Sequence, residues 1–131
     1  MAHPNEELVR KGYEAFANGD LETLGGIFSA DVVHSVPGDN LISGDHKGQD
    51  EVFALYGKLF ELSDGTMKVE LLDVKADGDD KVVARHRGTA TRGDKQLDEI
   101  ATIVFTIEDG KAVRLDESFE NQAAEDAFWS D

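Results

Sequence analysis

The chain has 131 residues, a formal net charge of −15 and no cysteine. A chain of this length forms a single hydrophobic core, so we expect one domain over residues 1–131. The lack of cysteine excludes disulfides, thiolate nucleophiles and cysteine-based metal sites, and 28 acidic against 13 basic residues argue against nucleic acid and anionic membranes as partners.

The N-terminal part of the chain is predicted to be a helical hairpin. Apolar side chains recur at helical spacing over residues 5–18. Asn18-Gly19-Asp20 then matches a helix end followed by the N-cap of a second, shorter helix, because Gly19 can adopt the left-handed conformation and Asp20 can cap.

A strand, a loop and a third helix are predicted next. Residues 32–36 are β-branched around His34 and end at Pro37-Gly38, which favours a short strand. Residues 40–43 are predicted as a further short strand within the following loop. Helical spacing returns over residues 48–63 and stops at Asp64-Gly65.

The C-terminal half changes to a period of two, which predicts strands. Four such stretches occur, at residues 66–76, 81–91, 96–107 and 111–119. The three turns between them supply Gly or Asp where a positive φ is needed, so the stretches are predicted to form an antiparallel meander. Residues 122–129 are predicted as a closing helix whose Phe128 and Trp129 dock on the body of the domain.

Together these elements predict an α+β fold. A cone-shaped, curved antiparallel sheet would carry three helices on its concave face and a short helix at the C-terminus, with an open end that admits a small molecule. The sequence shows neither a secretory leader nor an apolar run long enough to span a membrane, so cytoplasmic localisation is expected.

Several short segments, taken in order, carry a family resemblance. They are Asn18-Gly19-Asp20, Ala30-Asp31-Val32-Val33 with Val36-Pro37-Gly38, Ser43-Gly44-Asp45-His46-Lys47-Gly48, Glu108-Asp109-Gly110-Lys111, and the segment 122–129. In this pattern the chain resembles the SnoaL-like polyketide cyclases and the ketosteroid isomerases of the nuclear-transport-factor-2-like superfamily. The resemblance implies the cystatin-like cone described above and a homodimer through the outer face of the sheet.

The resemblance does not extend to the ketosteroid isomerase mechanism. Those enzymes use an Asp base with a Tyr and a protonated Asp as the oxyanion hole. Aligned by motif, the three positions fall at about Val36, Gly12 and Ile103, none of which can exchange a proton. Unless the register is displaced by one residue, this argues against steroid isomerisation by that route.

His34, Glu99 and Glu117 are predicted as the catalytic residues. The resemblance implies that the strand faces that carry them line the cavity. His34 is the preferred base, because only imidazole titrates near neutral pH without help. Glu99 or Glu117 is the expected partner carboxylate, because burial of a carboxyl group raises its pKa toward the useful range. The alternative for His34 is a purely structural imidazole, and for either Glu an internal ion pair with Arg85 or Arg87.

Tyr56, Arg85 and Arg87 are the predicted ligand-binding donors. Tyr56 matches a cavity-lining aromatic residue of the isomerases, although a tyrosine on an apolar helix face more often belongs to the core. The two arginines alternate with His86, so they lie on one face of their strand and His86 on the other. Inward arginines would bind a carbonyl or anionic ligand, whereas outward arginines would lie on the dimerisation face.

The resemblance adds an apolar lining for the ligand, formed by Val36, Ile103, Leu115 and Phe119. No metal and no cofactor is predicted, because the acidic residues around His46 match no known ligand pattern. The predicted function is binding of an apolar or amphipathic small molecule, polyketide-like or steroid-like, with acid–base chemistry of an isomerase, cyclase or hydratase-like lyase. The alternative is a non-catalytic binding or dimerisation module.

Overall fold

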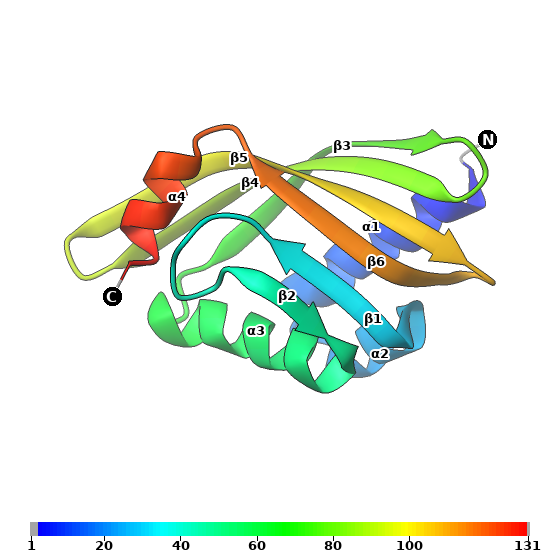
Figure 1. Ribbon diagram of the computed structural model, residues 1–131, viewed down its shortest axis with the longest axis horizontal. Helices are drawn as coiled ribbons and strands as arrows, with labels where there is room; N and C mark the ends of the chain where they lie inside the picture. Colours follow the sequence, from blue (N-terminus) through cyan, green and yellow to red (C-terminus); the bar gives the residue numbers. More distant parts are fainter. Residues whose placement is uncertain (1–2, 131) are drawn as a thin grey trace.

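The computed structural model describes residues 3–130, which form four helices and a six-stranded sheet (Figure 1). In chain order the elements are α1 (Pro4–Ala17), α2 (Leu21–Ile27), β1 (Phe28–Val36), β2 (Gly44–Lys47), α3 (Gly48–Leu62), β3 (Lys68–Asp77), β4 (Lys81–Arg92), β5 (Lys95–Glu108), β6 (Lys111–Phe119) and α4 (Gln122–Phe128). The α+β class, the predicted helices and the four C-terminal strands are confirmed, with small changes at their ends.

Local sequence signals set the helical hairpin. Gly19 has a φ of 67° and turns the chain after α1. The carboxylate of Asp20 then accepts a hydrogen bond of 3.1 Å from the backbone N–H of Thr23, which caps α2. This cap satisfies one of the backbone donors that a helix leaves free at its start.

The predicted strand at residues 40–43 is wrong. The side chain of Asn40 accepts a hydrogen bond from the backbone N–H of Ile42, and the Asn40 N–H donates to the hydroxyl of Ser43. Such local bonds hold the backbone in a turn and compete with strand pairing. The strand lies just after this turn instead, as β2, which pairs antiparallel with β1.

The sheet is mixed rather than wholly antiparallel as predicted. Its strand order is β2-β1-β6-β5-β4-β3. The meander from β3 to β6 is antiparallel, as expected, but its last strand returns in the same direction as β1, so β1 and β6 pair in parallel. This pairing places residues from the first and last thirds of the chain side by side.

Helices α1, α2 and α3 cover one face of the sheet, with α1 against β3 and β4 and α3 against β1 (Figure 1). Shifts of register interrupt the β3–β4, β5–β6 and β1–β6 pairings. Bulges of this kind bend strands, and the sheet curves around the helices to leave a hollow between the two layers.

Helix α4 closes one end of this hollow. Phe128 and Trp129 are buried, as predicted, and the backbone carbonyl of Trp129 accepts a hydrogen bond from the N–H of Leu41. The guanidinium of Arg92 donates to the carbonyl of Phe128, which ties α4 to the end of β4. Within residues 3–130, every helix is too short or too polar to cross a bilayer.

Candidate functional site

Two adjoining cavities lie between the helices and the inner face of the sheet. The larger, of about 90 Å³, is walled by apolar side chains of helices α1, α2 and α3 and of strands β1, β3, β5 and β6, and is called here the apolar cavity. Polar side chains enter its wall at one place, from Tyr13, His34, Tyr56, His86 and Glu117. The cavity is therefore mostly apolar, with polar side chains on one part of its wall.

The smaller cavity, of about 40 Å³, is called here the acidic cavity. Glu99, Glu117 and Glu125 line it, beside the indole of Trp129. Neither cavity has Lys or Arg among its described lining residues. His34, His86 and Glu117 line both cavities and so form the boundary between them.

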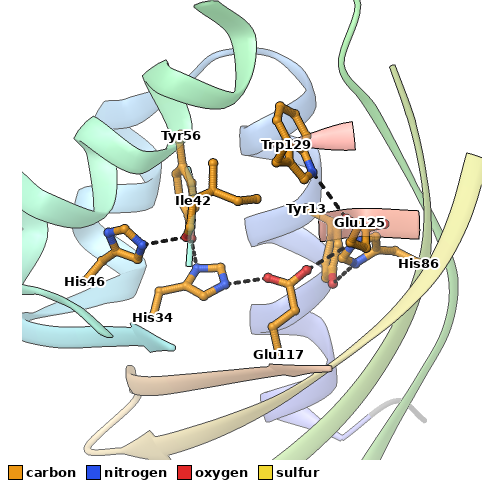
Figure 2. A network of polar contacts seen from close by, with 9 residues as sticks. All are labelled: Tyr13, His34, Ile42, His46, Tyr56, His86, Glu117, Glu125 and Trp129. Atoms are coloured by element: carbon orange, nitrogen blue, oxygen red, sulfur yellow. Dashed lines mark hydrogen bonds and ion pairs between the residues drawn. The ribbon is translucent and has the colours of Figure 1, made fainter. Parts of the chain in front are cut away.

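A buried chain of hydrogen bonds starts at Tyr56 on α3 (Figure 2). The Tyr56 hydroxyl lies 2.9 Å from Nδ1 of His34, and Nε2 of His34 lies 2.8 Å from Oε1 of Glu117. His34 comes from β1 and Glu117 from β6, and the parallel pairing of these strands holds the two side chains next to each other. Both ring nitrogens of His34 are therefore engaged by protein groups.

A second Tyr–His pair flanks Glu117 from the other side (Figure 2). The Tyr13 hydroxyl lies 2.8 Å from Nδ1 of His86, and Nε2 of His86 lies 4.0 Å from Oε2 of Glu117. The first pair is thus hydrogen-bonded to the carboxylate, whereas the second is only near it.

The hydrogen-bond partners of His34 and His86 determine the tautomer of each imidazole. If each tyrosine hydroxyl donates to the Nδ1 it touches, each neutral imidazole carries its hydrogen on Nε2, pointing toward Glu117. The reverse tautomer would leave each buried hydroxyl hydrogen without an acceptor among the described residues. One carboxylate therefore lies between two imidazoles whose Nε2 atoms are both aimed at it.

Burial sets the acidity of this group. Desolvation, helped by the charge of Glu117, raises the pKa of Tyr13 and of Tyr56 well above the usual tyrosine value, so both remain hydroxyls. Desolvation lowers the pKa of His86, although Glu117 opposes the shift. The tyrosines are hydrogen-bond donors rather than bases, and His86 favours the neutral form.

Glu125 on α4 adds a further buried carboxyl group. Its Oε1 accepts a hydrogen bond of 3.2 Å from the indole N–H of Trp129. Burial, followed by repulsion from Glu117, Glu99 and Asp126, raises the pKa of Glu125 to about 7, although the indole hydrogen bond opposes the shift. Glu125 is therefore partly protonated near neutral pH.

The structure brings His34, Tyr56 and Glu117 of the predicted site together. Glu99 is half-buried on the wall of the acidic cavity and makes neither a hydrogen bond nor an ion pair with a described side chain. The carboxylate bonded to His34 is therefore that of Glu117. The predicted apolar residues also line the cavities, Ile103 and Leu115 the apolar one and Val36 and Phe119 the acidic one.

Arg85 and Arg87, predicted as ligand-binding donors, line neither of the two cavities. Both side chains are about half exposed on the outer face of the sheet, where Arg85 lies near Glu120 and Arg87 forms a two-pronged pair with Asp98. The alternative that they pair with Glu99 or Glu117 is wrong for the same reason. Strand alternation sends His86 inward instead.

Sequence reasoning missed Tyr13, His86 and Glu125 as cavity residues. Tyr13 is one position beyond Gly12, where the isomerase motif places its tyrosine, so a displacement of one residue in that alignment would have found it. His86 was recognisable as the neighbour of two outward arginines. Glu125 carries no signal, because a Glu on a short polar helix is normally solvated.

Within residues 3–130, no three His, Asp or Glu side chains are arranged to hold a metal ion. The chemistry available is that of a carboxylate, two imidazoles and two phenols at the wall of an apolar chamber. Such groups can bind a ligand's oxygen atoms and move protons.

Comparison with known proteins identifies close relatives. The model of the SnoaL-like domain family matches residues 9–115. An uncharacterized protein of Mycobacterium tuberculosis is 40% identical over 124 residues, which cover 95% of each chain. Bal32a, from a soil-derived mobile gene cassette, is also 40% identical and superposes with a TM-score of 0.94 over 96% of each chain.

Two further solved structures share the fold. A protein of unknown function from Xanthomonas campestris, with a cystatin-like fold, is 32% identical and has a TM-score of 0.88, covering 95% of this chain and 97% of its own. TerC, crystallised with polyporic acid, is 22% identical and has a TM-score of 0.83, covering 96% of this chain and 98% of its own. The likeness to TerC shows the fold alone.

Proposed function

The chain belongs to the SnoaL-like domain family, and on that premise we propose that it binds a compact, largely apolar small molecule and moves a proton on it without a cofactor. The reaction would be that of an isomerase, a cyclase or a hydratase-like lyase. The ligand would be polyketide-like or steroid-like in its apolar surface. The co-crystallisation of TerC with polyporic acid supports a small molecule as an occupant of this fold.

The observation that carries the proposal is the chain Tyr56–His34–Glu117 at the polar wall of the apolar cavity. Oε1 of Glu117 accepts from His34, but Oε2 makes no hydrogen bond with a described residue. A carboxylate with one fixed oxygen and one free oxygen, at the edge of an apolar chamber, is suited to accept a proton from a bound ligand.

We infer for His34 a role other than that of the direct base. Its two ring nitrogens are bonded to Tyr56 and Glu117, so neither is free to meet a ligand. His34 is instead a positioning residue that holds the carboxylate in place and stabilises its charge. Glu117 is the proposed proton acceptor, and Glu99 is a wall residue of the adjoining cavity.

The test combines binding and turnover. Carbonyl, epoxide and polyketide-like compounds are screened by thermal shift, and those that bind are assayed for conversion with the wild type and with Glu117→Gln. We expect the variant to keep binding and melting temperature but to lose about 100-fold or more in turnover, as for removal of a general base. Glu108→Gln makes the same change of charge at an exposed position and should leave turnover unaltered.

The alternative function is a non-catalytic binding module. It would be supported if compounds bound to the wild type without conversion, or if Glu117→Gln turned over as fast as the wild type. The proposal of acid–base catalysis would then be abandoned, while ligand binding would stand.

We also propose a homodimer through the outer face of the sheet. Val83, Ile100 and Val104 lie there as half-buried apolar side chains, and Val83 pairs with Val104 across β4 and β5. Covering such a face with a second copy would remove it from water. Light scattering should give twice the mass of one chain, and a mass of one chain would contradict the proposal.

A further inference from the structure

The acidic cavity gathers three carboxyl groups inside the domain. Glu99 comes from β5, Glu117 from β6 and Glu125 from α4. The two imidazoles on this wall, His34 and His86, both face Glu117, and burial favours the neutral form of His86 by lowering its pKa. Among the described residues no Lys or Arg lines the cavity, so Glu99 and Glu125 have no cationic partner there.

Glu125 presents a free oxygen to this cavity. The residue is only 4% exposed, and its Oε1 accepts the indole N–H of Trp129, but its Oε2 makes no hydrogen bond with a described residue. Within residues 3–130, every side-chain nitrogen or oxygen that is completely enclosed has a hydrogen-bond partner. Oε2 therefore borders open space, and the acidic cavity is the space that Glu125 lines.

The carboxyl groups lie close enough to repel one another. After burial, the charges of Glu117 and Glu99 are among the causes that raise the pKa of Glu125. Asp126 acts in the same direction, but its carboxylate already accepts a hydrogen bond from Asn40. A cation in the acidic cavity would offset this repulsion and favour the charged form of Glu125.

The basic side chains that touch α4 do not supply this cation. Lys95 donates to the carbonyl of Ala127 and to the hydroxyl of Ser130, and Arg92 donates to the carbonyl of Phe128. These contacts lie at the C-terminal end of α4, and neither basic residue lines the acidic cavity. The positive charge that fits the cavity is therefore one that a ligand would bring.

Building on the proposed function, we propose that the acidic cavity binds the ammonium group of a primary amine at Glu99 and Glu125, while the apolar body of the same molecule fills the apolar cavity. An ammonium offers three hydrogens, and its hydrogen bonds to carboxylates are among the stronger ones in proteins. Leu59 and Met67 line both cavities, as Glu117 does, so the two parts of the ligand would occupy adjacent spaces.

The first test compares two probes of the same shape. 2-Phenylethylamine carries an ammonium at neutral pH, as Lys does, whereas 2-phenylethanol has a hydroxyl in its place. Calorimetric titration is done in about 0.5 M NaCl, where attraction by exposed charges is largely screened. We expect the wild type to bind the amine about ten- to a hundredfold more tightly than the alcohol, the worth of a hydrogen bond between charged groups.

Variants then locate the ammonium. Glu99→Gln and Glu125→Gln should each lose most of the preference for the amine and keep the affinity for 2-phenylethanol. Glu108→Gln removes the same charge at an exposed position and should keep the preference. Loss of preference in either cavity variant supports the inference, and a preference that survives in both overturns it. Circular dichroism confirms that each variant is folded.

The second test needs only the wild type. Since the pKa of Glu125 is about 7, its carboxyl group is largely protonated at about pH 6.5, and a bound ammonium would drive the proton off. Titrations in two buffers with different ionisation enthalpies should show release of roughly half a proton or more with the amine and none with the alcohol. Equal heats in the two buffers for the amine would overturn the assignment to Glu125. Because Glu99, Glu117, His34 and His86 line the same cavity, Glu125→Gln serves as the control in which the release should disappear.

The outcomes separate this inference from the proposed function. If 2-phenylethanol binds as tightly as the amine, or if the amine fails to bind while compounds from the thermal-shift screen do, the inference is wrong and small-molecule binding stands. If neither these probes nor any screened compound binds the wild type, the proposed function fails and the inference fails with it.

Discussion

The hydroxyl of Tyr56 and Nδ1 of His34 lie 2.9 Å apart, and both side chains are almost completely buried. Removing one partner leaves the other buried without a hydrogen bond, which costs about 1–3 kcal/mol. We therefore expect Tyr56→Phe and His34→Phe each to lower the free energy of unfolding by that amount. In urea titrations the double variant should lose less than the sum, and strict additivity would show that the two residues do not interact.

The raised pKa of Glu125 predicts a dependence of stability on pH. The folded protein holds this proton up to about pH 7, whereas the group has an ordinary value of 4.5 when solvated. The folded state thus binds more protons between these values, so Glu125 lowers the free energy of unfolding as the pH rises through this window. The full effect, on the order of 1–3 kcal/mol, is reached above pH 7 and is absent below about pH 4.

Glu125→Gln removes this titration and keeps an oxygen for the indole of Trp129. We expect the variant to melt at a higher temperature than the wild type above pH 7 and at the same temperature near pH 4. Glu117, Glu99 and Asp126 are present in both proteins, so the difference between the two melting temperatures at each pH reports on the titration of Glu125. A difference that does not change with pH would contradict the predicted shift.

A side chain at Gly38 is predicted to destabilise the fold. It has a φ of 97°, and a Cβ there would overlap Nε2 of Gln122 and Oδ1 of Asp126. Gly44 has a φ of 115° but open space around it, so Gly44→Ala carries backbone strain without the overlap. We expect both alanine variants to melt lower than the wild type, with Gly38→Ala well below Gly44→Ala. Equal losses would mean that the Gly38 loop can move away from α4.

Arg85 and Arg87 should be dispensable for ligand binding, because they lie on the face of the sheet opposite to the cavities. We expect Arg85→Ala and Arg87→Ala to bind the compounds found in the thermal-shift screen as tightly as the wild type does. Calorimetric titration measures this directly. Weakened binding in either variant would mean that a ligand contacts the outer face.

Most of the fold could be predicted because its signals are local. The Gly19-Asp20 pair, the helical spacing of residues 48–63 and the alternation in the last four strands each depend on neighbours in sequence. The turn at Asn40 was missed because its side-chain hydrogen bonds do not appear in a hydrophobic pattern. The parallel partner of β1 was missed because strand pairing between distant segments has no local signal.

The site was predictable in part for the same reason. Alternation along a strand shows that His86 lies on the opposite face from Arg85 and Arg87. It does not show which of the two faces the helices cover, and that decides which residues point inward. His34 and Glu117 could be named as candidates separately. The sequence could not decide whether Glu99 or Glu117 contacts His34, since 83 positions separate His34 from Glu117 in the chain.

The pairing of β1 with β6 has a consequence for biosynthesis. His34 emerges from the ribosome early, whereas its carboxylate partner on β6 is made near the end of translation. A nascent or truncated chain that lacks the last strand leaves His34 without its carboxylate partner and leaves one edge of β1 unpaired, so the Tyr56–His34–Glu117 chain and the complete sheet form in the same final step.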